Sequence, residues 1–500
     1  MNDIASLISG SDVRGKALGE GAPLTPEVGY RIGQAFSAWL RGRGVQSPKV
    51  SIGRDPRLSG EALEAAIADG LCSAGARVTR FGLATTPAMF MSLVRPEFSG
   101  DASVMVTASH LPWERNGYKF FLPDGGISSS VLREILALAD SDRDLTVPGG
   151  TQDRFSFLPV YTGILMEKIC QALGEEAPLG GLSVVVDAGN GAGGFYAKML
   201  EQLGADTSGS QFLEPDGRFP NHIPNPENEE AMASVRRATL AAGADLGVIF
   251  DTDCDRAAIV DADGREINRN RLIALISAVL LQREPGATIV TDSVTSAGLA
   301  EFIASRGGVH HRFRRGYRNV IDESRRLNEA GVSSPLAIET SGHAALRENY
   351  FLDDGMYLVT LLIIEAVRMK RKGQSLASLI LDLREPVESA EIRLPLPAEG
   401  FRPIGERAIE TVVAAAEREP DWRIAPDNRE GIRVLFDLPD HPSAAWFLLR
   451  LSLHDPVLPL NLESDVPGGV AAMARALLTV LAPVQGIDLA PLANFVASAT

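Results

Sequence analysis

Residues 245–261 spell DLGVIFDTDCDRAAIVD, an acidic loop between two apolar segments that favour β-strands. Both flanks are short and rich in aliphatic and β-branched residues, so the pattern predicts strand, loop, strand. Asp251, Asp253 and Asp255 stand at every second position of this loop. On an extended chain alternate side chains point the same way, so three carboxylate oxygens can meet one Mg²⁺ ion, which offsets their mutual repulsion.

Three other interpretations of this acidic loop are an EF-hand, an aspartyl-phosphatase pair and a solvated acidic turn. An EF-hand loop requires glycine at its sixth position and glutamate at its twelfth, where this chain has Arg256 and Ala262. The phosphatase pattern has threonine or valine where Asp255 stands. From this motif alone, a solvated acidic turn remains open.

A second motif, ASVMVTASHLPWERNGYK, covers residues 102–119. Residues 102–106 predict a short strand, and Pro112 keeps Ser109 on the irregular connection that follows it. Chemistry is often placed where strands end, although a serine between small residues is more commonly a turn or a helix cap. Ser109 is therefore the candidate to carry a phosphoryl group, with Lys119 ten residues later.

Composition limits the class of protein. Five hundred residues predict three or four domains, and 45% hydrophobic with 22% charged residues is typical of a folded globular chain. The net charge of −16 argues against nucleic acid or anionic membranes as partners, but a local phosphate site remains possible. Cys72, Cys170 and Cys254 form no close pair, and neither an export signal nor a long apolar run is present, so we expect a cytoplasmic location.

Strand and helix patterns alternate along most of the chain, which predicts an α/β fold with layered units. Residues 50–52 and 77–80 favour strands around a helical pattern at 61–67. The C-terminal part differs, because a strand-like run at 446–451 and a helix at about 470–481 indicate a smaller α+β unit with an antiparallel sheet. The expected domains are 1–155, 156–262, 263–380 and 381–500.

The two motifs, together with six further segments, resemble the α-D-phosphohexomutase family, and specifically its phosphomannomutase/phosphoglucomutase branch. The resemblance covers nearly the whole chain. The further segments are DVRG at 12–15, GRDPRLSG at 53–60, VVVDAGNG at 184–191, DGRFPNH at 216–222, ETSGH at 339–343 and RLSLHDP at 450–456.

The resemblance implies three similar α/β domains and a smaller α+β domain, four domains around a central active-site cleft. It implies that phosphorylated Ser109 exchanges a phosphoryl group with a hexose phosphate through a hexose 1,6-bisphosphate, which also serves as activator. Mg²⁺ would be bound by Ser109 and the three aspartates. Lys119 and Arg14 match positions that move or support the proton, and a lysine base needs its pKa lowered. His110 is placed beside the phosphoserine in a supporting role, because neighbours on an extended chain point apart.

Substrate recognition also follows from the resemblance. The expected substrate-binding residues are Arg256, Glu339, Ser341, His343, Arg433, Arg450, Ser452 and His454. In this branch the Glu-x-Ser pattern contacts hydroxyls that glucose and mannose share, so both hexose phosphates are implied. Leu453 and His454 replace the asparagine or glycine and the threonine that usually follow the serine of the C-terminal phosphate loop. The resemblance also implies a monomer or a small homo-oligomer.

Three alternatives to a glucose or mannose phosphate mutase remain. One is a phosphoglucosamine mutase of the same family. Another is a metal-dependent phosphatase, which would release inorganic phosphate and would keep its activity without Ser109. The third is a sugar-phosphate-binding regulator without catalytic activity, an idea motivated by the altered residues at 453–454.

Overall fold

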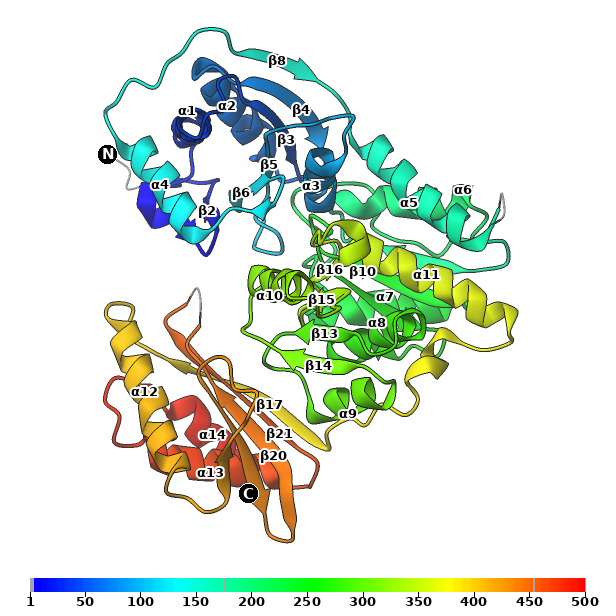
Figure 1. Ribbon diagram of the computed structural model, residues 1–500, viewed down its shortest axis with the longest axis vertical. Helices are drawn as coiled ribbons and strands as arrows, with labels where there is room; N and C mark the ends of the chain where they lie inside the picture. The colour runs from blue at the N-terminus through cyan, green and yellow to red at the C-terminus, as the bar shows by residue number, and fades with distance from the viewer. Residues whose placement is uncertain (1–3, 175–176, 453–454, 500) are drawn as a thin grey trace. The chain divides into compact units, whose positions relative to one another are not determined.

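A computed structural model describes residues 4–174, 177–452 and 455–499. The chain forms two compact units (Figure 1). The first comprises Met1–Leu272 and Ser341–Leu379, and the second comprises Ile273–Thr340 and Ile380–Thr500. Three α/β domains and a C-terminal sheet domain are distributed over these units, so the predicted fold class is confirmed.

The first sheet of unit 1 has the strand order β1-β2-β6-β5-β3-β4-β8, with β7 paired to β6. Strands β3, β4, β5 and β8 are parallel, whereas β6 is antiparallel to β5 and to β2. The strand bounds are β1 Ile8–Ser9, β2 Asp12–Lys16, β3 Lys49–Arg54, β4 Arg77–Leu83, β5 Ala102–Val106, β6 Arg115–Leu122, β7 Gly125–Gly126 and β8 Thr151–Arg154.

Four helices belong to this first domain, namely α1 Pro26–Gly42, α2 Gly60–Ser73, α3 Thr86–Val94 and α4 Ser129–Asp140. A short 3₁₀ helix, η1 Ile4–Leu7, precedes them. Apolar side chains of α1, α2 and α4 pack with those of the central strands into one buried core. Burial of this kind supplies most of the stability of an amphipathic helix. It also fixes the ends of β5 and β6.

The second sheet of unit 1 has the order β12-β11-β10-β9. β10 runs parallel to β9 and antiparallel to β11, so the acidic loop joins two adjacent antiparallel strands. The bounds are β9 Val184–Asp187, β10 Leu246–Phe250, β11 Ala257–Asp261 and β12 Glu266–Ile267. Strands β10 and β11 flank the acidic loop, which confirms the predicted strand, loop, strand arrangement, and all of their residues are buried.

Helices α5 Leu158–Leu173, α6 Phe195–Gln202, α7 Glu229–Ala242 and α11 Gly355–Arg371 accompany this sheet, together with η2 Ala192–Gly194, η3 Arg347–Asn349 and strand β16 Ala344–Leu346. Figure 1 shows α5 and α11 side by side. The Tyr161 hydroxyl on α5 donates to Asp354 Oδ1 at 2.7 Å, and the same oxygen accepts the Tyr357 backbone N–H at 2.8 Å. Asp354 therefore caps α11 and ties it to α5.

Unit 2 contains a parallel group of strands in the order β14-β13-β15. Its elements are β13 Thr288–Thr291, α9 Ala297–Ser305, β14 Val309–Arg312, α10 Tyr317–Glu329 and β15 Leu336–Ile338. Helix α8 Arg269–Arg283 leads from unit 1 into unit 2. The chain enters unit 2 a second time at the end of η4 Leu376–Ile380.

The C-terminal sheet has the order β17-β21-β20-β19-β18 and is antiparallel throughout, as predicted. Helices α12, α13 and α14 cover one face (Figure 1), where a single apolar core is buried. The bounds are β17 Glu388–Pro395, α12 Phe401–Ala416, β18 Trp422–Ile424, β19 Ile432–Leu438, β20 His441–Leu449, β21 Val457–Ser464, α13 Gly469–Leu481 and α14 Ala490–Ser498.

Within the described residues, no helix is both long and apolar enough to span a bilayer.

Candidate active site and metal centre

Ser109 lies three residues past the end of β5 and is 7% exposed. Its hydroxyl donates to Asp251 Oδ2 at 2.9 Å and accepts from Arg256 Nη2 at 3.1 Å. Its backbone N–H donates to Thr107 Oγ1 at 2.8 Å. The residue has φ 50, which is the left-handed region that only a minority of non-glycine residues adopt. The structure thus brings together the two motifs that we singled out in the sequence.

The acidic loop is a tight turn, so our expectation of an extended segment was wrong. The Cys254 backbone N–H donates to Asp251 O at 3.2 Å, and Cys254 has φ 66. The Asp251 N–H in turn donates to Arg256 O. The chain reverses here because β10 and β11 are directly paired and only six residues connect them. The three carboxylates still converge, because the turn points them inward from different directions.

One oxygen from each of Asp251, Asp253 and Asp255 lies within 4.8 Å of the other two, and all three residues are buried. Asp253 Oδ1 and Asp255 Oδ1 have no hydrogen-bond partner among the described residues. Unpaired carboxylate oxygens are costly to bury, and oxygen ligands suit a hard cation such as Mg²⁺. This triad can hold a metal ion.

The charges around the triad favour the same conclusion. Burial raises the pKa of Asp251 to about 8, and the nearby Asp255 and Asp253 carboxylates add to that rise. Lys119 and Arg256 form ion pairs with the triad, and His343 lies 3.8 Å from Asp255 Oδ1. A further cation would relieve the repulsion that disfavours the ionised form of Asp251.

Lys119 lies on β6 and is buried beside the triad. Its Nζ donates to Asp253 Oδ2 at 2.8 Å and forms a second hydrogen bond with Asp255 Oδ2. Burial alone would lower the pKa of Lys119, but the two carboxylates outweigh it and hold the pKa well above its usual value. A lysine base needs a lowered pKa, so the described pairing with Asp253 and Asp255 gives the opposite direction from the one that this role requires.

Arg14 on β2 contacts the residues that precede Ser109. Its Nη1 donates to Thr107 O at 2.7 Å, and its Nη2 donates to Asp12 Oδ2 at 2.8 Å. The guanidinium is thus held next to the strand end, with only 10% of its side chain exposed.

His110 contacts both Ser109 and Arg256, in contrast to our expectation that it would point away from Ser109. Its Nδ1 accepts from Arg256 Nη2 and lies 3.3 Å from Ser109 Oγ. The left-handed backbone at Ser109 brings the two neighbouring side chains to the same side. Burial and then the Arg256 charge lower the pKa of His110 to about 2. Because arginine has no acceptor, the Nδ1 lone pair is occupied and cannot take the Ser109 proton.

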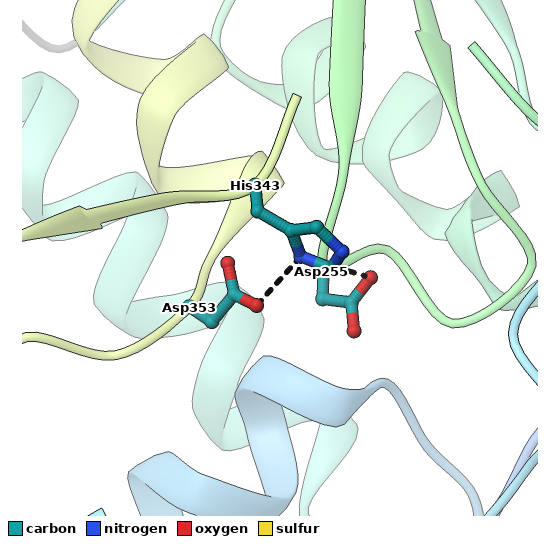
Figure 2. Close-up of side chains that lie close together, drawn as sticks. All are labelled: Asp255, His343 and Asp353. Carbon is teal, nitrogen blue, oxygen red and sulfur yellow. Dashed lines mark hydrogen bonds and ion pairs between the residues drawn. The ribbon is translucent and has the colours of Figure 1, made fainter. Parts of the chain in front are cut away.

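His343 approaches the triad from the segment before β16 (Figure 2). Its Nδ1 forms a hydrogen bond with Asp353 Oδ2 at 2.6 Å and lies 3.8 Å from Asp255 Oδ1. Burial lowers the pKa of His343, but Asp353 and then Asp255 outweigh burial and raise it to about 9. The sequence analysis missed Asp353; its signal was the pair of aspartates at 353–354 directly before α11.

Thr86, the first residue of α3, is a second contact that the sequence analysis missed. Its hydroxyl donates to Asp253 Oδ2 at 2.6 Å, and its backbone N–H donates to Asp253 O at 2.9 Å. The start of α3 thus fixes the middle ligand of the triad. The stretch LATTP at 83–87 indicates a helix start, but nothing in it indicates which distant residue the helix meets.

Ser341 belongs to unit 1, whereas Glu339 belongs to unit 2. The Ser341 hydroxyl is buried and has no hydrogen-bond partner among the described residues. Within unit 2, Glu339 Oε1 accepts the Gly316 backbone N–H at 2.6 Å.

Arg433 lies on β19 in unit 2 and is 3% exposed. Its Nη1 donates to Ser293 O at 2.7 Å, its Nη2 donates to Thr295 O at 3.4 Å, and its guanidinium lies 3.6 Å from the centre of the Trp446 ring. In the described state this arginine joins the C-terminal sheet to the loop after β13.

The phosphate loop that we predicted after β20 is described in part. Arg450 is 7% exposed, and its Nε has no hydrogen-bond partner among the described residues. The Ser452 backbone N–H donates to Val457 O, and its hydroxyl accepts the Asp455 N–H at 3.2 Å. His454 lies outside the described residues.

Comparison with known families gives three consecutive matches. Residues 6–145, 165–264 and 268–387 match phosphoglucomutase/phosphomannomutase α/β/α domains I, II and III, respectively. Similar curated proteins include a phosphomannomutase/phosphoglucomutase of Pseudomonas putida, 31% identical with 92% of each chain covered. A phosphomannomutase of Salmonella typhimurium is 32% identical over 94% of this chain and 97% of its own.

The fold is similar to that of a crystal structure of a phosphoglucomutase/phosphomannomutase family protein from Burkholderia thailandensis. The TM-score is 0.79 at 28% identity, and the match covers 97% of this chain and 99% of that one.

Proposed function

The chain belongs to the phosphoglucomutase/phosphomannomutase family, and on that basis we propose that it interconverts hexose 1-phosphates and hexose 6-phosphates. It is an intramolecular phosphotransferase of the isomerase class. One observation carries the assignment of the reacting group: the Ser109 hydroxyl contacts Asp251, although 142 residues separate them in the sequence. The proposed substrates are the phosphates of glucose and mannose.

The reaction consists of two phosphoryl transfers. In the first, the Oγ–P bond of phosphorylated Ser109 breaks while a P–O bond forms to the free hydroxyl of the hexose phosphate. The hydroxyl proton passes to a base, and Ser109 keeps the electron pair on Oγ. The hexose 1,6-bisphosphate then turns, and Ser109 Oγ attacks its other phosphorus. The sugar oxygen that leaves takes up a proton, which restores the phosphoserine and releases the isomer.

The rate of such a transfer depends mainly on how the reacting groups are positioned and how their charge is stabilised. The contacts of Ser109 can contribute to both. Arg256 Nη2 reaches Ser109 Oγ at 3.1 Å and can offset the negative charge of the phosphoryl group. His110 holds that guanidinium in place through the hydrogen bond to its Nδ1. This arrangement assigns His110 to support of Arg256.

Asp251, Asp253 and Asp255, with an oxygen of phosphorylated Ser109, are the proposed ligands of Mg²⁺. Asp253 Oδ1 and Asp255 Oδ1 have no hydrogen-bond partner among the described residues, and the all-oxygen donor set fits this ion. When bound, Mg²⁺ supplies positive charge that stabilises the phosphoryl group in transfer. A hexose 1,6-bisphosphate is the proposed activator, because it phosphorylates Ser109 at the start of catalysis.

Lys119 and Arg14 are the proposed groups for moving the proton. Both are held within the site, Lys119 by Asp253 and Asp255, and Arg14 by the carbonyl of Thr107. In the described pairing the high pKa of Lys119 makes it an acid, so it acts as a base only when its two carboxylate partners are engaged by another cation.

Glu339, Ser341 and His343 are proposed to bind the sugar, with Arg450, Ser452 and His454 at its phosphate. The Ser341 hydroxyl and Arg450 Nε, neither of which has a hydrogen-bond partner within the described residues, support this assignment. We retain the four domains 1–155, 156–262, 263–380 and 381–500 as part of the proposal. The proposal also includes a monomeric or small homo-oligomeric state. It further includes a cytoplasmic location, with which the three free cysteines are compatible.

Phosphorus NMR tests the function directly. The purified protein is incubated with Mg²⁺, a trace of glucose 1,6-bisphosphate and, in separate tubes, glucose 1-phosphate, mannose 1-phosphate or glucosamine 1-phosphate. Conversion of a 1-phosphate signal into a 6-phosphate signal is the expected result for glucose or mannose. Preferred turnover of the amino sugar would replace the substrate assignment. Release of inorganic phosphate, or no change in any tube, would contradict the mutase.

A further inference from the structure

Arg57 is a fully buried arginine next to the serine loop, and no role has been given to it so far. It follows β3 in the segment GRDPRLSG and is 1% exposed. A buried guanidinium is costly unless each of its donors is paired, so its partners identify what it holds.

All five N–H donors of Arg57 are used, and four of them bind one short loop. Nη1 donates to Pro112 O at 2.7 Å and to Arg115 O at 3.0 Å. Nη2 donates to Leu111 O at 2.7 Å and to Ser109 O. The carbonyls of residues 109–115 therefore converge on a single cation. The fifth donor, Nε, binds Asp55 Oδ2 at 3.1 Å.

Asp55 continues this network to the other side of Ser109. The Thr107 hydroxyl donates to Asp55 Oδ2 at 2.7 Å and accepts the Ser109 backbone N–H at 2.8 Å. The peptide groups before and after Ser109 are thus both fixed, the first through Thr107 and the second through Arg57. These bonds stabilise the left-handed backbone of Ser109, a strained conformation that needs such support.

The segment DGRFPNH of the second domain covers the other side of this arginine. The Phe219 ring centre lies 5.1 Å from the Arg57 guanidinium, and Gly217 forms a β-bridge with Arg57. A Cβ at Gly217 would lie only 2.3 Å from Pro56 O, so glycine is required for this close approach. Two motifs from different domains therefore meet at one guanidinium.

We infer that Arg57 is a positioning residue for phosphoryl transfer, and that it holds Ser109 Oγ toward Asp251 by binding the carbonyls of the serine loop. Within the described residues, the hydrogen bonds of the Arg57 side chain go to Asp55 and to backbone carbonyls and not to the triad carboxylates, so its action passes through the backbone of residues 109–115. This inference rests on the proposed function, because it concerns the efficiency of Ser109 as phosphoryl carrier.

The test compares Arg57→Lys and Arg57→Met with the wild type under the conditions given above. Lysine offers one point charge and three donors, which cannot serve four carbonyls and Asp55 at once. Because a displacement of about 1 Å costs about 100-fold in rate, we expect kcat per folded molecule to fall about 100-fold, with KM changed less than about threefold. Phosphoryl transfer from the isolated phosphoenzyme in a single turnover should slow by the same factor.

Arg80→Lys is the matched control. Arg80 is also a largely buried arginine of the first domain, but its Nε and Nη2 donate to Glu64 at 3.3 Å. We expect it to keep the wild-type kcat. In Arg57→Ala, added guanidinium ions should restore part of the lost kcat, whereas ammonium at the same ionic strength should not.

Each result decides the matter. A wild-type kcat in folded Arg57→Lys or Arg57→Met would overturn the inference, and so would an effect on KM alone. A fall in activity that only follows the folded fraction, measured by circular dichroism, would overturn it as well. If the Arg57 variants fail to fold, Phe219→Leu, which removes only the ring over the guanidinium, should lower kcat severalfold at constant KM; an unchanged kcat would contradict the inference. If the wild type itself does not turn over, the proposed function fails instead.

Discussion

Replacing Asp253 by asparagine tests the metal centre with the smallest change in shape. Asp253 is completely buried, its Oδ2 is bonded to Lys119 and Thr86, and its Oδ1 is unpaired. The substitution removes one of the three negative charges that the triad offers to a cation. The variant should therefore bind Mg²⁺ more weakly and turn over more slowly.

The magnitude follows from the geometry. The attraction between a divalent ion and one carboxylate charge is about 8 kcal/mol at about 4 Å with an effective dielectric constant of about 20, and it is larger at the shorter distance of a direct ligand. Desolvation of the carboxylate offsets much of this. Loss of outer-shell partners alone costs about 10–100-fold in metal affinity, so for a direct ligand we expect an increase of at least about 100-fold in the Mg²⁺ concentration for half-maximal rate, or about 2.7 kcal/mol.

The assay is a Mg²⁺ titration of the initial mutase rate, combined with calorimetric titration of the metal. Asp261→Asn is the control, because Asp261 ends β11 and accepts only the backbone N–H groups of its own turn, from Asp263 and Arg265. It should leave the Mg²⁺ dependence unchanged. An unchanged Mg²⁺ dependence in Asp253→Asn, or a wild-type rate in the presence of a chelator, would refute the metal assignment.

Three further predictions concern stability and loop position. His222 binds Asp187 through Nε2 at 3.0 Å. Burial lowers the pKa of His222, but the bond to Asp187 outweighs burial and leaves the pKa raised. The ion pair therefore contributes its full stabilisation of the fold below about pH 6.5, and this contribution is lost as pH rises through the folded pKa. The midpoint of thermal unfolding should thus differ more between the wild type and His222→Gln at pH 5.5 than at pH 9, and an equal difference would contradict the ion pair. Tyr161→Phe removes a donor from the buried Asp354 carboxylate and should lower the free energy of unfolding by about 1.5–3 kcal/mol. Tyr196→Phe is the control, because its partner is the neutral Thr360 hydroxyl, and it should cost about 0.5–1.5 kcal/mol. Equal costs would disprove the charged acceptor. Gly342→Ala places a Cβ 2.7 Å from Ala257 O and should lower kcat/KM about tenfold, or about 1.4 kcal/mol, whereas Gly373→Ala has the same left-handed strain with open space around it and should not.

The elements around the site could be predicted from the sequence because each carries a strong local signal. Strand β5 has the predicted bounds, and β10 and β11 flank the acidic loop as expected, since short runs of aliphatic residues bounded by polar ones favour buried strands. The spacing of the three aspartates also predicted their convergence. The reason we gave for it was wrong, because the convergence depends on a turn with a left-handed Cys254.

Contacts between distant residues could not be predicted, because no local pattern encodes them. Arg57 and Thr86 each meet residues more than fifty positions away, and their roles became evident only from the hydrogen bonds. The backbone of Ser109 was equally hidden, since a left-handed conformation is usually indicated by glycine or asparagine. That conformation is what brings His110 to Arg256, and it reverses our expectation for His110.

The charge state of Lys119 shows a further limit of sequence reasoning. Burial could be expected for a lysine on a central strand, and burial alone lowers a lysine pKa. The opposite result arises from two carboxylates that approach from another domain of unit 1. The direction of such a shift depends on partners that only the fold supplies.

The central claim is that Ser109 carries the phosphoryl group. The most direct test is mass spectrometry of the protein after incubation with glucose 1,6-bisphosphate and Mg²⁺, before and after addition of excess glucose 1-phosphate. We predict one phosphoryl group on the peptide that contains Ser109, its transfer to the added sugar, and neither event in Ser109→Ala. A phosphoryl group on another residue, or wild-type turnover by Ser109→Ala, would contradict the account.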